Sequence, residues 1–501
     1  MEQRIVVREA RGVDRKQLVA EAKRRVTEAF DAGGRLLSPV AGSWIHPAGF
    51  YTAIASIDGG AIAELPTLSA PAVAGAVEAV QRELPAWAER PLAERIDAVR
   101  RATLILREHR DLLVALLAWE IGKTLKTAGN DVDRCLVGVE WYLGECARML
   151  EGRRPIGVVS NIASWNYPFS VLLMTMLVQA LAGNAVIAKS PAQGGGLSLT
   201  LAVALARRAG VPLSLVGGRG RDLTEPLVGH SALAGVAFVG GRANGAAVLD
   251  RLRGTSKRYA LEMEGVNAYA VTAFSDWAGL EKQIRAGFEY GKQRCTAYTR
   301  WVVERSLVPS FVETYARAAS SIRVGHPLLD VAVDFGPLIN AAKVDELGTR
   351  IREARALGAE TLFEGTLAED AFLPDQSRAA YLAPTLLTGL APHLDLYQRE
   401  PFGPVDVLVA VDSDEELVRE ANVSGGALVA SVATDDVARG ERLAARLMAF
   451  KTGINALRSR GDKEEAFGGR GASWHGSFVG GTNLVLAFTD GEARGDGNFG
   501  S

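Results

Sequence analysis

The residue with the clearest potential for chemistry is Cys295, which lies in the segment GKQRCTAYTR. It is one of three cysteines in 501 residues, and Lys292 and Arg294 flank it. A cysteine thiolate is a nucleophile and a metal ligand, and nearby positive charge favours the thiolate over the thiol. Free cysteine is also among the most buried residue types, so Cys295 taken alone fits a small core residue better. A catalytic role requires partners elsewhere in the chain.

Predicted strand ends supply candidate partners. Asn166 follows the run IGVVSNIA, and an Asn amide can donate a hydrogen bond to a developing oxyanion. Lys189 closes the run AVIA, where it could reach a ribose hydroxyl or a phosphate. Glu262 and Glu264 in LEMEGVNA share one side if this run is a strand, and a buried carboxylate can act as a general base. Each also has a structural explanation: a turn-forming Asn before proline, a solvated lysine, and acids exposed in a loop.

A glycine-rich turn follows another predicted strand. In VGGRANG, Gly240, Gly241 and Gly245 open a predicted helix, whose N–H groups and dipole could face a pyrophosphate. The spacing differs from the G-x-G-x-x-G dinucleotide fingerprint, and similar turns occur without ligands.

Alternating strands and helices must position these residues. Residues 70–151 place apolar residues at helical spacing, and from Ile156 short apolar runs alternate with helices. This alternation predicts a doubly wound parallel sheet, whose ligands bind at the carboxyl ends of its strands. The pattern resumes after Cys295 and predicts a second α/β domain. The glycine-rich tail from about Ala466 is predicted to end in one apolar strand, TNLVLAFT.

The composition indicates a globular protein that binds neither nucleic acid nor an anionic membrane. Hydrophobic residues make up 48% and charged residues 23%, and the formal net charge is −2, so we expect no nucleic acid or anionic membrane as partner. The cysteines are too few and scattered for disulfides or a metal site, and the N-terminus lacks an apolar signal region. We therefore expect a cytoplasmic protein without a metal. Residues 169–188 are uncharged, but Gly183 and Asn184 favour a buried helix followed by a strand over a membrane span.

These motifs together resemble the aldehyde dehydrogenase superfamily, in its order and at about its spacing. The resemblance covers some 300 residues from Ile156 and becomes sparse in the N-terminal part. It rests on these segments: SWNYP (164–168), KSPA (189–192), FVGG (238–241), LEMEGVN (261–267), GKQRC (291–295), REPFGP (399–404), Asn455 and FGGRGAS (467–473).

The resemblance implies a catalytic role for three residues and cofactor binding for six. Cys295 would attack the aldehyde carbonyl, the Asn166 side chain and the Cys295 N–H would hold the oxyanion, and Glu262 would activate the water that hydrolyses a thioester. The residues implied for NAD or NADP are Trp165, Lys189, Gly240, Gly241, Glu400 and Phe402.

The resemblance also implies an architecture. We expect an aldehyde dehydrogenase-like α/β fold with two doubly wound parallel-sheet domains, a helical N-terminal part and a short oligomerisation tail. The expected boundaries are 1–260 for the N-terminal helices and the NAD(P)-binding domain, 261–450 for the catalytic domain, and 451–501 for a segment returning to the cofactor domain and the oligomer interface. The family's usual pair of oligomerisation strands is missing before Ile156, which favours a homodimer over a tetramer.

Three departures bear on the cofactor. Val239 and Gly241 replace the usual Thr and Ser of the FTGS turn, which removes a hydroxyl from the start of the helix, and Arg242 is a candidate to compensate. Ala192 stands where a Glu often disfavours NADP. Glu264 puts an acid where the family has Gly.

Three functions remain open at this point. The first is hydrolytic, NAD(P)-dependent oxidation of a small-molecule aldehyde to a carboxylic acid, which Glu262 favours. The second is a coenzyme-A-acylating dehydrogenase, a branch that generally lacks that base. The third is a cofactor-impaired binding protein, suggested by the altered turns. The arginines Arg458, Arg460 and Arg470 and His475 could bind a substrate carboxylate or lie solvated in a loop.

Overall fold

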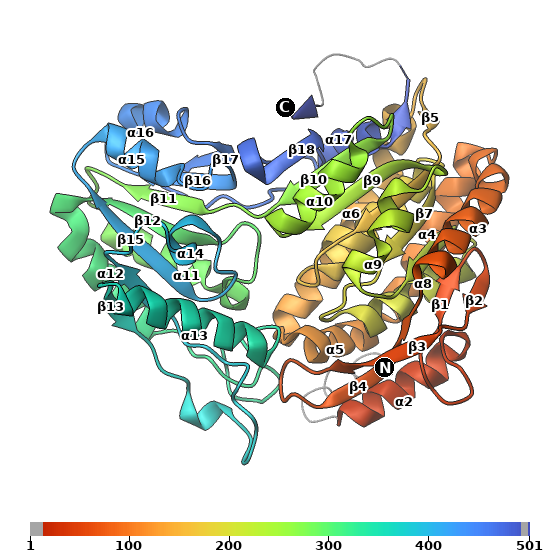
Figure 1. The fold of residues 1–501 in the computed structure, drawn as a ribbon, viewed down its shortest axis with the longest axis horizontal. Coiled ribbons are helices and arrows are strands. Elements are labelled where there is room, and N and C mark those ends of the chain that lie inside the picture. The colour runs from red at the N-terminus through yellow and green to blue at the C-terminus, as the bar shows by residue number, and fades with distance from the viewer. Residues whose placement is uncertain (1–13, 492–498, 501) are drawn as a thin grey trace.

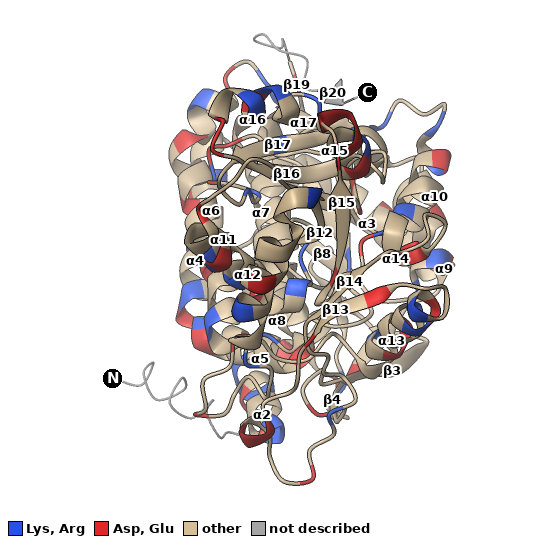
Figure 2. Cartoon of the chain, turned by 90° about the vertical axis from the view of Figure 1, so that its left-hand side faces the viewer, with Lys and Arg blue, Asp and Glu red and all other residues tan. Residues whose placement is uncertain are grey.

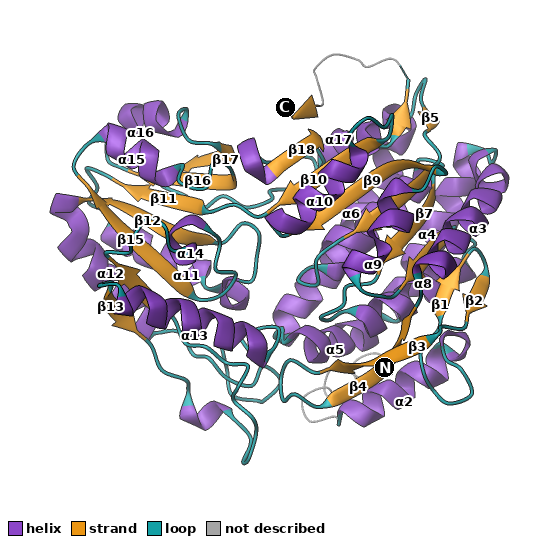
Figure 3. Ribbon diagram, viewed as in Figure 1, coloured by secondary structure: helices purple, strands orange, loops and turns teal. Residues whose placement is uncertain are grey.

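The computed structural model describes residues 14–491 and 499–500. These residues form two lobes, each built on its own seven-stranded sheet (Figure 1). Both sheets are mainly parallel, and helices precede and cover them (Figure 3). The predicted α/β class with two parallel-sheet domains and a helical N-terminal part is confirmed.

The first sheet has the strand order β20-β18-β10-β9-β6-β7-β8. Strands β10, β9, β6, β7 and β8 run parallel, whereas β18 is antiparallel to β10 and β20 is antiparallel to β18. The strands span Val158–Ile162 (β6), Ala185–Lys189 (β7), Leu213–Val216 (β8), Leu233–Gly240 (β9), Arg258–Met263 (β10), Trp474–Ser477 (β18) and Phe499–Gly500 (β20). Burial on both faces explains why the sequence of β7, AVIAK, is apolar up to its last residue.

Helices cover both faces of the first sheet. Val158 and Ile187 belong to the cluster that packs against α3, whereas their neighbours Val159 and Val186 belong to the large core cluster of α7 and α8. Alternate residues therefore face opposite layers, as the pleat of a strand requires. The helices are α3 (Ala70–Ala88), α4 (Leu92–Glu108), α5 (Arg110–Ile121), α6 (Leu125–Met149), α7 (Met174–Leu181), α8 (Gly196–Arg208), α9 (Gly220–Thr224) and α10 (Arg242–Leu252).

The uncharged segment 169–188 is a buried helix followed by a strand, as predicted. A π-helical turn, Pro168–Leu173, leads into α7, and β7 follows it in the sheet. Among the described helices none is long and apolar enough to cross a membrane.

The second sheet has the order β13-β14-β15-β12-β11-β16-β17, and only its edge strand β13 is antiparallel. Its strands are β11 (Asn267–Val271), β12 (Tyr298–Glu304), β13 (Glu360–Glu364), β14 (Thr385–Thr388), β15 (Val405–Val411), β16 (Ala427–Ala433) and β17 (Ala449–Ile454). The helices of this lobe are α11 (Trp277–Gly287), α12 (Val308–Ser320), α13 (Ala341–Ala356), α14 (Asp395–Gln398), α15 (Asp414–Ala421) and α16 (Val437–Ala444). Helices α12 and α13 carry charges of both signs, whereas β16 is uncharged and buried along its length (Figure 2).

Both ends of the described chain pack against the first lobe. The N-terminal part contains the helix α2 (Arg15–Arg25) and four strands. The strands form two hairpins beside α8: β1 (Ser38–Val40) with β2 (Ser43–Ile45), and β3 (Gly49–Ile54) with β4 (Ala61–Thr67). After β18, α17 (Gly481–Ala487) packs on α7, and β19 (Thr489–Asp490) pairs with β5 (Arg154–Pro155). The two-residue β5 is the one strand between α6 and β6.

The predicted final strand is wrong. TNLVLAFT forms most of α17, and only its last residue enters β19. Gly480 and Gly481 adopt positive φ angles of 77° and 49° and turn the chain into this helix, which buries Leu484 and Val485 on one face. A short apolar run has no periodicity long enough to distinguish the two structures.

Candidate active site

A cavity of about 260 Å³ lies between the two lobes and contains most of the predicted site residues. Its lining includes Trp165, Asn166, Gly240, Gly241, Glu262, Cys295, Glu400 and Phe402. Lys189 is outside this lining, at the carboxyl end of β7. Residues distant in sequence therefore meet in one concave site, which is where ligands usually bind.

The two sheets contribute opposite ends of their strands to this cavity. Asn166 follows β6, Gly240 ends β9, and Glu262 is near the end of β10, so the first sheet presents its carboxyl ends. Cys295 precedes β12 and Glu400 precedes β15, so the second sheet presents its amino ends. The nucleophile candidate and the base candidate therefore come from different lobes.

The backbone before Cys295 is strained. Tyr290, Gly291 and Lys292 adopt consecutive left-handed conformations with φ of 55°, 57° and 60°. For the two residues with side chains this costs about 1–3 kcal/mol each, a strain that persists only where the surroundings hold it. The Tyr290 hydroxyl, which donates to the Ile121 carbonyl at 2.8 Å, is one such restraint.

Two amide side chains fix the Cys295 segment. Asn267 Nδ2 donates to the Cys295 carbonyl at 2.8 Å, and its Oδ1 accepts from the Val429 N–H at 3.1 Å. Gln293 Oε1 accepts from the Ile339 N–H at 2.9 Å. These bonds tie the loop to β16 and to the segment before α13, so they hold the cysteine at the cavity wall.

The two cations beside Cys295 in the sequence do not serve its sulfur. Lys292 is fully buried, and its Nζ donates to both carboxylate oxygens of Asp406 at 2.7 and 2.6 Å. Arg294 pairs instead with Glu289 at 2.7 Å. Lys292 therefore anchors the loop before Cys295 to Asp406 of the second sheet.

The pKa of the Cys295 thiol is raised well above its usual range. Burial is the main cause, and the neighbouring carboxylate of Glu262 adds to it. The Arg460 guanidinium opposes this effect, and Glu400 raises the pKa further. The thiol form is therefore favoured at neutral pH, and reaction requires a base that takes its proton.

Glu262 and Asn166 are placed to serve such a reaction. The side chain of Glu262 is 3% exposed, and neither of its oxygens has a hydrogen-bond partner within the described part of the chain. Asn166 Nδ2 donates to the Gln293 carbonyl at 3.0 Å, and since an amide group carries two N–H donors, one remains. Both residues are buried in the cavity wall.

The other half of the cavity fits a nicotinamide dinucleotide. Glu400 is 6% exposed, and its Oε1 has no hydrogen-bond partner among the described residues. Burial raises the pKa of its carboxyl group. This group can therefore bond a ligand group such as a ribose hydroxyl. Lys189 Nζ donates to the neighbouring Ser190 carbonyl at 2.9 Å, and burial lowers its pKa to about 8. A Cβ placed on Gly241 would meet nothing closer than 3.7 Å, so backbone N–H groups at the start of α10 are accessible.

Glu264 opposes an anionic ligand at the start of α10. It lies just after β10 rather than within it, and its Oε2 is the atom 3.7 Å from that Cβ position on Gly241. Arg242 Nη2 donates to the Glu264 carbonyl at 3.3 Å and not to its carboxylate. The acid therefore sits beside the helix start without a neutralising contact from Arg242.

Sequence reasoning missed the contact between Arg460 and Glu262, and also the role of Asn267. Arg460 Nη1 is 3.6 Å from Glu262 Oε2. Asn267 ends the motif LEMEGVN, and Arg460 was a candidate for binding a substrate carboxylate, but neither contact could be read from sequence, because each residue acts across the boundary between chain segments. Two neighbouring cations, Lys292 and Arg294, gave a stronger local signal than Arg460.

Comparisons with known proteins show the family and the fold of this chain. The model of the aldehyde dehydrogenase family matches residues 44–491. The NADP-dependent glyceraldehyde-3-phosphate dehydrogenase of Bacillus halodurans C-125, solved with NADP, is similar over 91% of this chain and 98% of its own, with 26% identity and a TM-score of 0.82. HpcC of Thermus thermophilus is similar over 95% of this chain and 94% of its own, with 26% identity and a TM-score of 0.84. Betaine aldehyde dehydrogenase of Staphylococcus aureus, solved with NAD+, shares the fold at 21% identity, with a TM-score of 0.82 over 95% of this chain and 96% of its own.

Proposed function

The chain belongs to the aldehyde dehydrogenase family, and from this premise we propose that it oxidises an aldehyde to the free carboxylic acid through a covalent intermediate on Cys295. The observation that carries the proposal is the meeting of Cys295, Asn166 and Glu262 in one cavity with the dinucleotide-compatible surface around Glu400 and Gly241. Each group alone has a structural explanation, but the combination supports acyl chemistry next to a nicotinamide.

The first step is addition to the aldehyde. The Cys295 sulfur forms a bond to the carbonyl carbon, and the thiol proton passes to Glu262, the neighbouring carboxylate. The remaining Asn166 N–H and the Cys295 backbone N–H donate to the oxyanion as negative charge develops on it. The product is a thiohemiacetal on Cys295.

Oxidation requires a hydride acceptor, which bound NAD or NADP supplies. Glu400 and Lys189 would hold the two riboses, the backbone near Gly240 and Gly241 would face the pyrophosphate, and Phe402 and Trp165 would border the nicotinamide. Their rings already contact each other edge to face at 5.8 Å between centroids. Loss of hydride from the thiohemiacetal carbon leaves a thioester.

Hydrolysis then returns the enzyme to its starting state. Glu262, after losing its proton to solvent, takes a proton from water while the water oxygen attacks the thioester carbonyl. The carbon–sulfur bond breaks, the proton held by Glu262 passes to the departing Cys295 sulfur, and the carboxylic acid leaves. A buried carboxylate whose oxygens have no hydrogen-bond partner among the described residues suits this role, since both oxygens stay able to accept a proton.

Turnover with a panel of aldehydes tests this proposal. The purified protein is mixed with NAD or NADP, and reduced cofactor is followed by absorbance, with Cys295→Ala as the control. Product formation that depends on Cys295 and is not accelerated by coenzyme A is expected. No turnover together with no cofactor-induced rise in melting temperature would overturn it, and acceleration by coenzyme A would assign the acylating reaction instead.

The domain boundaries at 260 and 450, the homodimer and the cytoplasmic location stay predictions. Strand β17, Ala449–Ile454, belongs to the second sheet, and the chain joins the first sheet again at β18.

A further inference from the structure

Arg460 reaches the active site from the segment after β17. Its Nη1 lies 3.6 Å from Glu262 Oε2, and its guanidinium carbon lies 4.6 Å from the centre of the Phe467 ring. The ring supports one face of the guanidinium, a favourable cation–π arrangement. The side chain is thus held beside the carboxylate by packing as well as by charge.

Arg460 and Glu262 also share a second, smaller cavity beside the active site. Its volume is about 30 Å³, and most of its other lining residues are apolar, such as Phe238 and Trp474. Glu262 lines both this cavity and the larger one, so it forms part of the wall between them. Arg460 therefore approaches the carboxylate from the side away from Gly241 and Glu400.

The Arg460–Glu262 pair differs from the fully buried ion pairs of the chain. Lys292 and Asp406 bond at 2.6 Å, and Tyr315 donates a further hydrogen bond to Asp406. By contrast, the Glu262 oxygens and Arg460 Nη1 have no hydrogen-bond partner in the described ranges 14–491 and 499–500. The pair has the charge of a salt bridge but leaves both carboxylate oxygens able to accept a proton.

We propose that Arg460 is a positioning residue for both reacting groups: it orients Glu262, and it offsets the negative charge of Glu262 at Cys295. This rests on the proposed function, in which Glu262 takes a proton twice. A hydrogen-bonded partner would block the carboxylate, and no partner at all would leave a buried charge uncompensated. The 3.6 Å contact meets both requirements.

The charges that act on Cys295 come from three elements. Glu262 on β10 and Glu400 before β15 raise the thiol pKa, and Arg460 after β17 lowers it. Removing the cation therefore raises the thiol pKa further, so a higher pH is needed to form the thiolate. Removing the Glu262 charge has the opposite effect.

Alkylation of Cys295 by iodoacetamide measures this coupling without any turnover. The rate is followed across pH by the mass of the Cys295 peptide, in wild type, Arg460→Gln, Arg460→Lys and Glu262→Gln. We expect the half-maximal pH to rise in Arg460→Gln by at least about half a unit, to return most of the way in Arg460→Lys, and to fall in Glu262→Gln. The matched control is Arg458→Gln, because Arg458 lies 3.6 Å from Glu465 instead, and its profile should match wild type.

Single-turnover deacylation with a neutral aldehyde such as propanal gives the second measurement. Arg460→Gln should slow deacylation about tenfold, a fraction of what a general base contributes, with KM unchanged. In the Glu262→Gln background the same substitution should slow it little further, since Arg460 acts through Glu262.

Three results would overturn the proposal. One is an alkylation profile of Arg460→Gln identical to wild type. Another is equal slowing of deacylation in both backgrounds. The third is an effect confined to KM for anionic aldehydes, which would make Arg460 a substrate contact. If the chain turns over no aldehyde, the alkylation profiles still decide whether Arg460 governs Cys295.

Discussion

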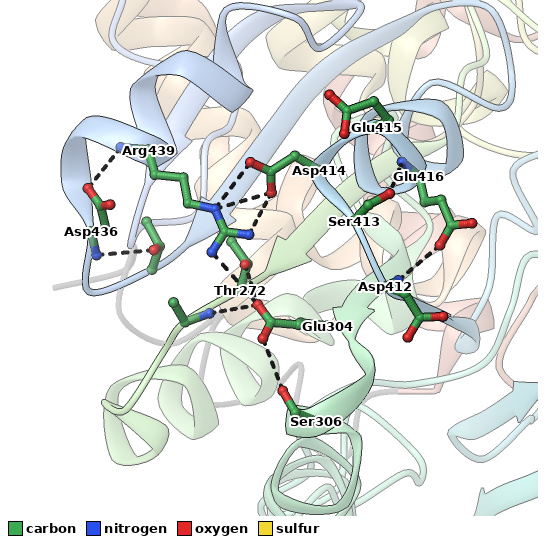
Figure 4. Close-up of polar contacts among 12 residues, drawn as sticks. Thr272, Glu304, Ser306, Asp412, Ser413, Asp414, Glu415, Glu416, Asp436 and Arg439 are labelled. Atoms are coloured by element: carbon green, nitrogen blue, oxygen red, sulfur yellow. Dashed lines mark hydrogen bonds and ion pairs between the residues drawn. The ribbon is translucent and has the colours of Figure 1, made fainter.

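Two hollows of this molecule contain clusters of charged residues, and they differ in how those charges are satisfied. In the active-site cavity, Glu262 and Glu400 are buried with carboxylate oxygens that have no hydrogen-bond partner among the described residues. A second hollow of about 330 Å³ lies at the carboxyl ends of β11, β12 and β15, and its charges are paired (Figure 4).

Arg439 is the centre of the second hollow. Its Nη2 bonds Asp414 at 2.6 Å, and its Nη1 lies 3.8 Å from Glu304. Glu304 also accepts hydrogen bonds from the hydroxyls of Thr272 at 2.6 Å and Ser306 at 3.0 Å. These contacts close the far edge of the second sheet with a network of ion pairs and hydrogen bonds (Figure 4).

The comparison shows that topology alone does not locate the site. Ligands of parallel sheets usually bind at the carboxyl ends of the strands, and the first lobe follows this rule. The second lobe reverses it: its amino ends carry Cys295 and Glu400, and its carboxyl ends carry the satisfied network. Unsatisfied buried groups therefore distinguish the reactive end from the structural one.

The largest expected effect is that of Cys295→Ala. Loss of the nucleophile should reduce kcat by at least about a thousandfold, with little change in melting temperature, because a small, partly buried side chain is replaced by a similar one. Steady-state kinetics and thermal unfolding check both parts. Cys146→Ala serves as the control and should retain activity. Full activity in Cys295→Ala would place the chemistry elsewhere.

Glu262→Gln should separate the two halves of the reaction. Thioester hydrolysis is expected to slow by about a hundredfold or more. The first burst of reduced cofactor is slowed much less, because loss of the Glu262 charge lowers the pKa of the Cys295 thiol and so offsets the loss of the group that takes its proton. Stopped-flow absorbance measures both phases. Equal slowing of the burst and the steady state contradicts the role of Glu262 in hydrolysis.

Glu264→Gln should tighten cofactor binding. Removing a charge beside the start of α10 reduces repulsion of a pyrophosphate, and we expect the Kd for NAD or NADP to fall roughly fivefold. Calorimetric titration measures this, with the gain shrinking at high salt. Glu346→Gln is the matched control, since Glu346 lines the same cavity but pairs with Lys343 and Arg350. Weaker binding in Glu264→Gln would make Glu264 a cofactor contact instead.

Arg439→Ala should leave activity within about twofold of wild type and lower stability. The pair with Asp414 is about one-third exposed, so screening limits the loss to about 1 kcal/mol of unfolding free energy. Urea unfolding and kcat/KM are measured on the same sample. A large loss of activity at full stability would assign the second hollow a functional role and break the contrast between the two sites.

Local sequence patterns predicted most of the fold, and long-range contacts account for what they missed. The run AVIA of β7 is buried on both faces, and Gly183 and Asn184 before it favoured a strand at this place. TNLVLAFT failed because its helix depends on two positive-φ glycines and on packing against α7.

The candidate site shows the same limit. The motifs of Cys295, Glu262 and Asn166 are local, and they identified residues that the fold brings together. The direction of a side chain is not local: Lys292 points to Asp406 because of the left-handed turn before the cysteine, and Arg460 reaches Glu262 across two segments. Nearness in sequence therefore pointed to Lys292 and Arg294, whereas the cation that lowers the pKa of the Cys295 thiol is Arg460.

The mass of the Cys295 peptide during turnover tests whether oxidation of the aldehyde passes through a covalent intermediate on Cys295. Glu262→Gln is mixed with cofactor and an aldehyde, quenched in acid and digested, and the peptide containing Cys295 is weighed. We expect an added acyl group on Cys295 that accumulates in step with reduced cofactor and is absent without cofactor. Reduced cofactor formed in full while the Cys295 peptide keeps its unmodified mass would contradict it.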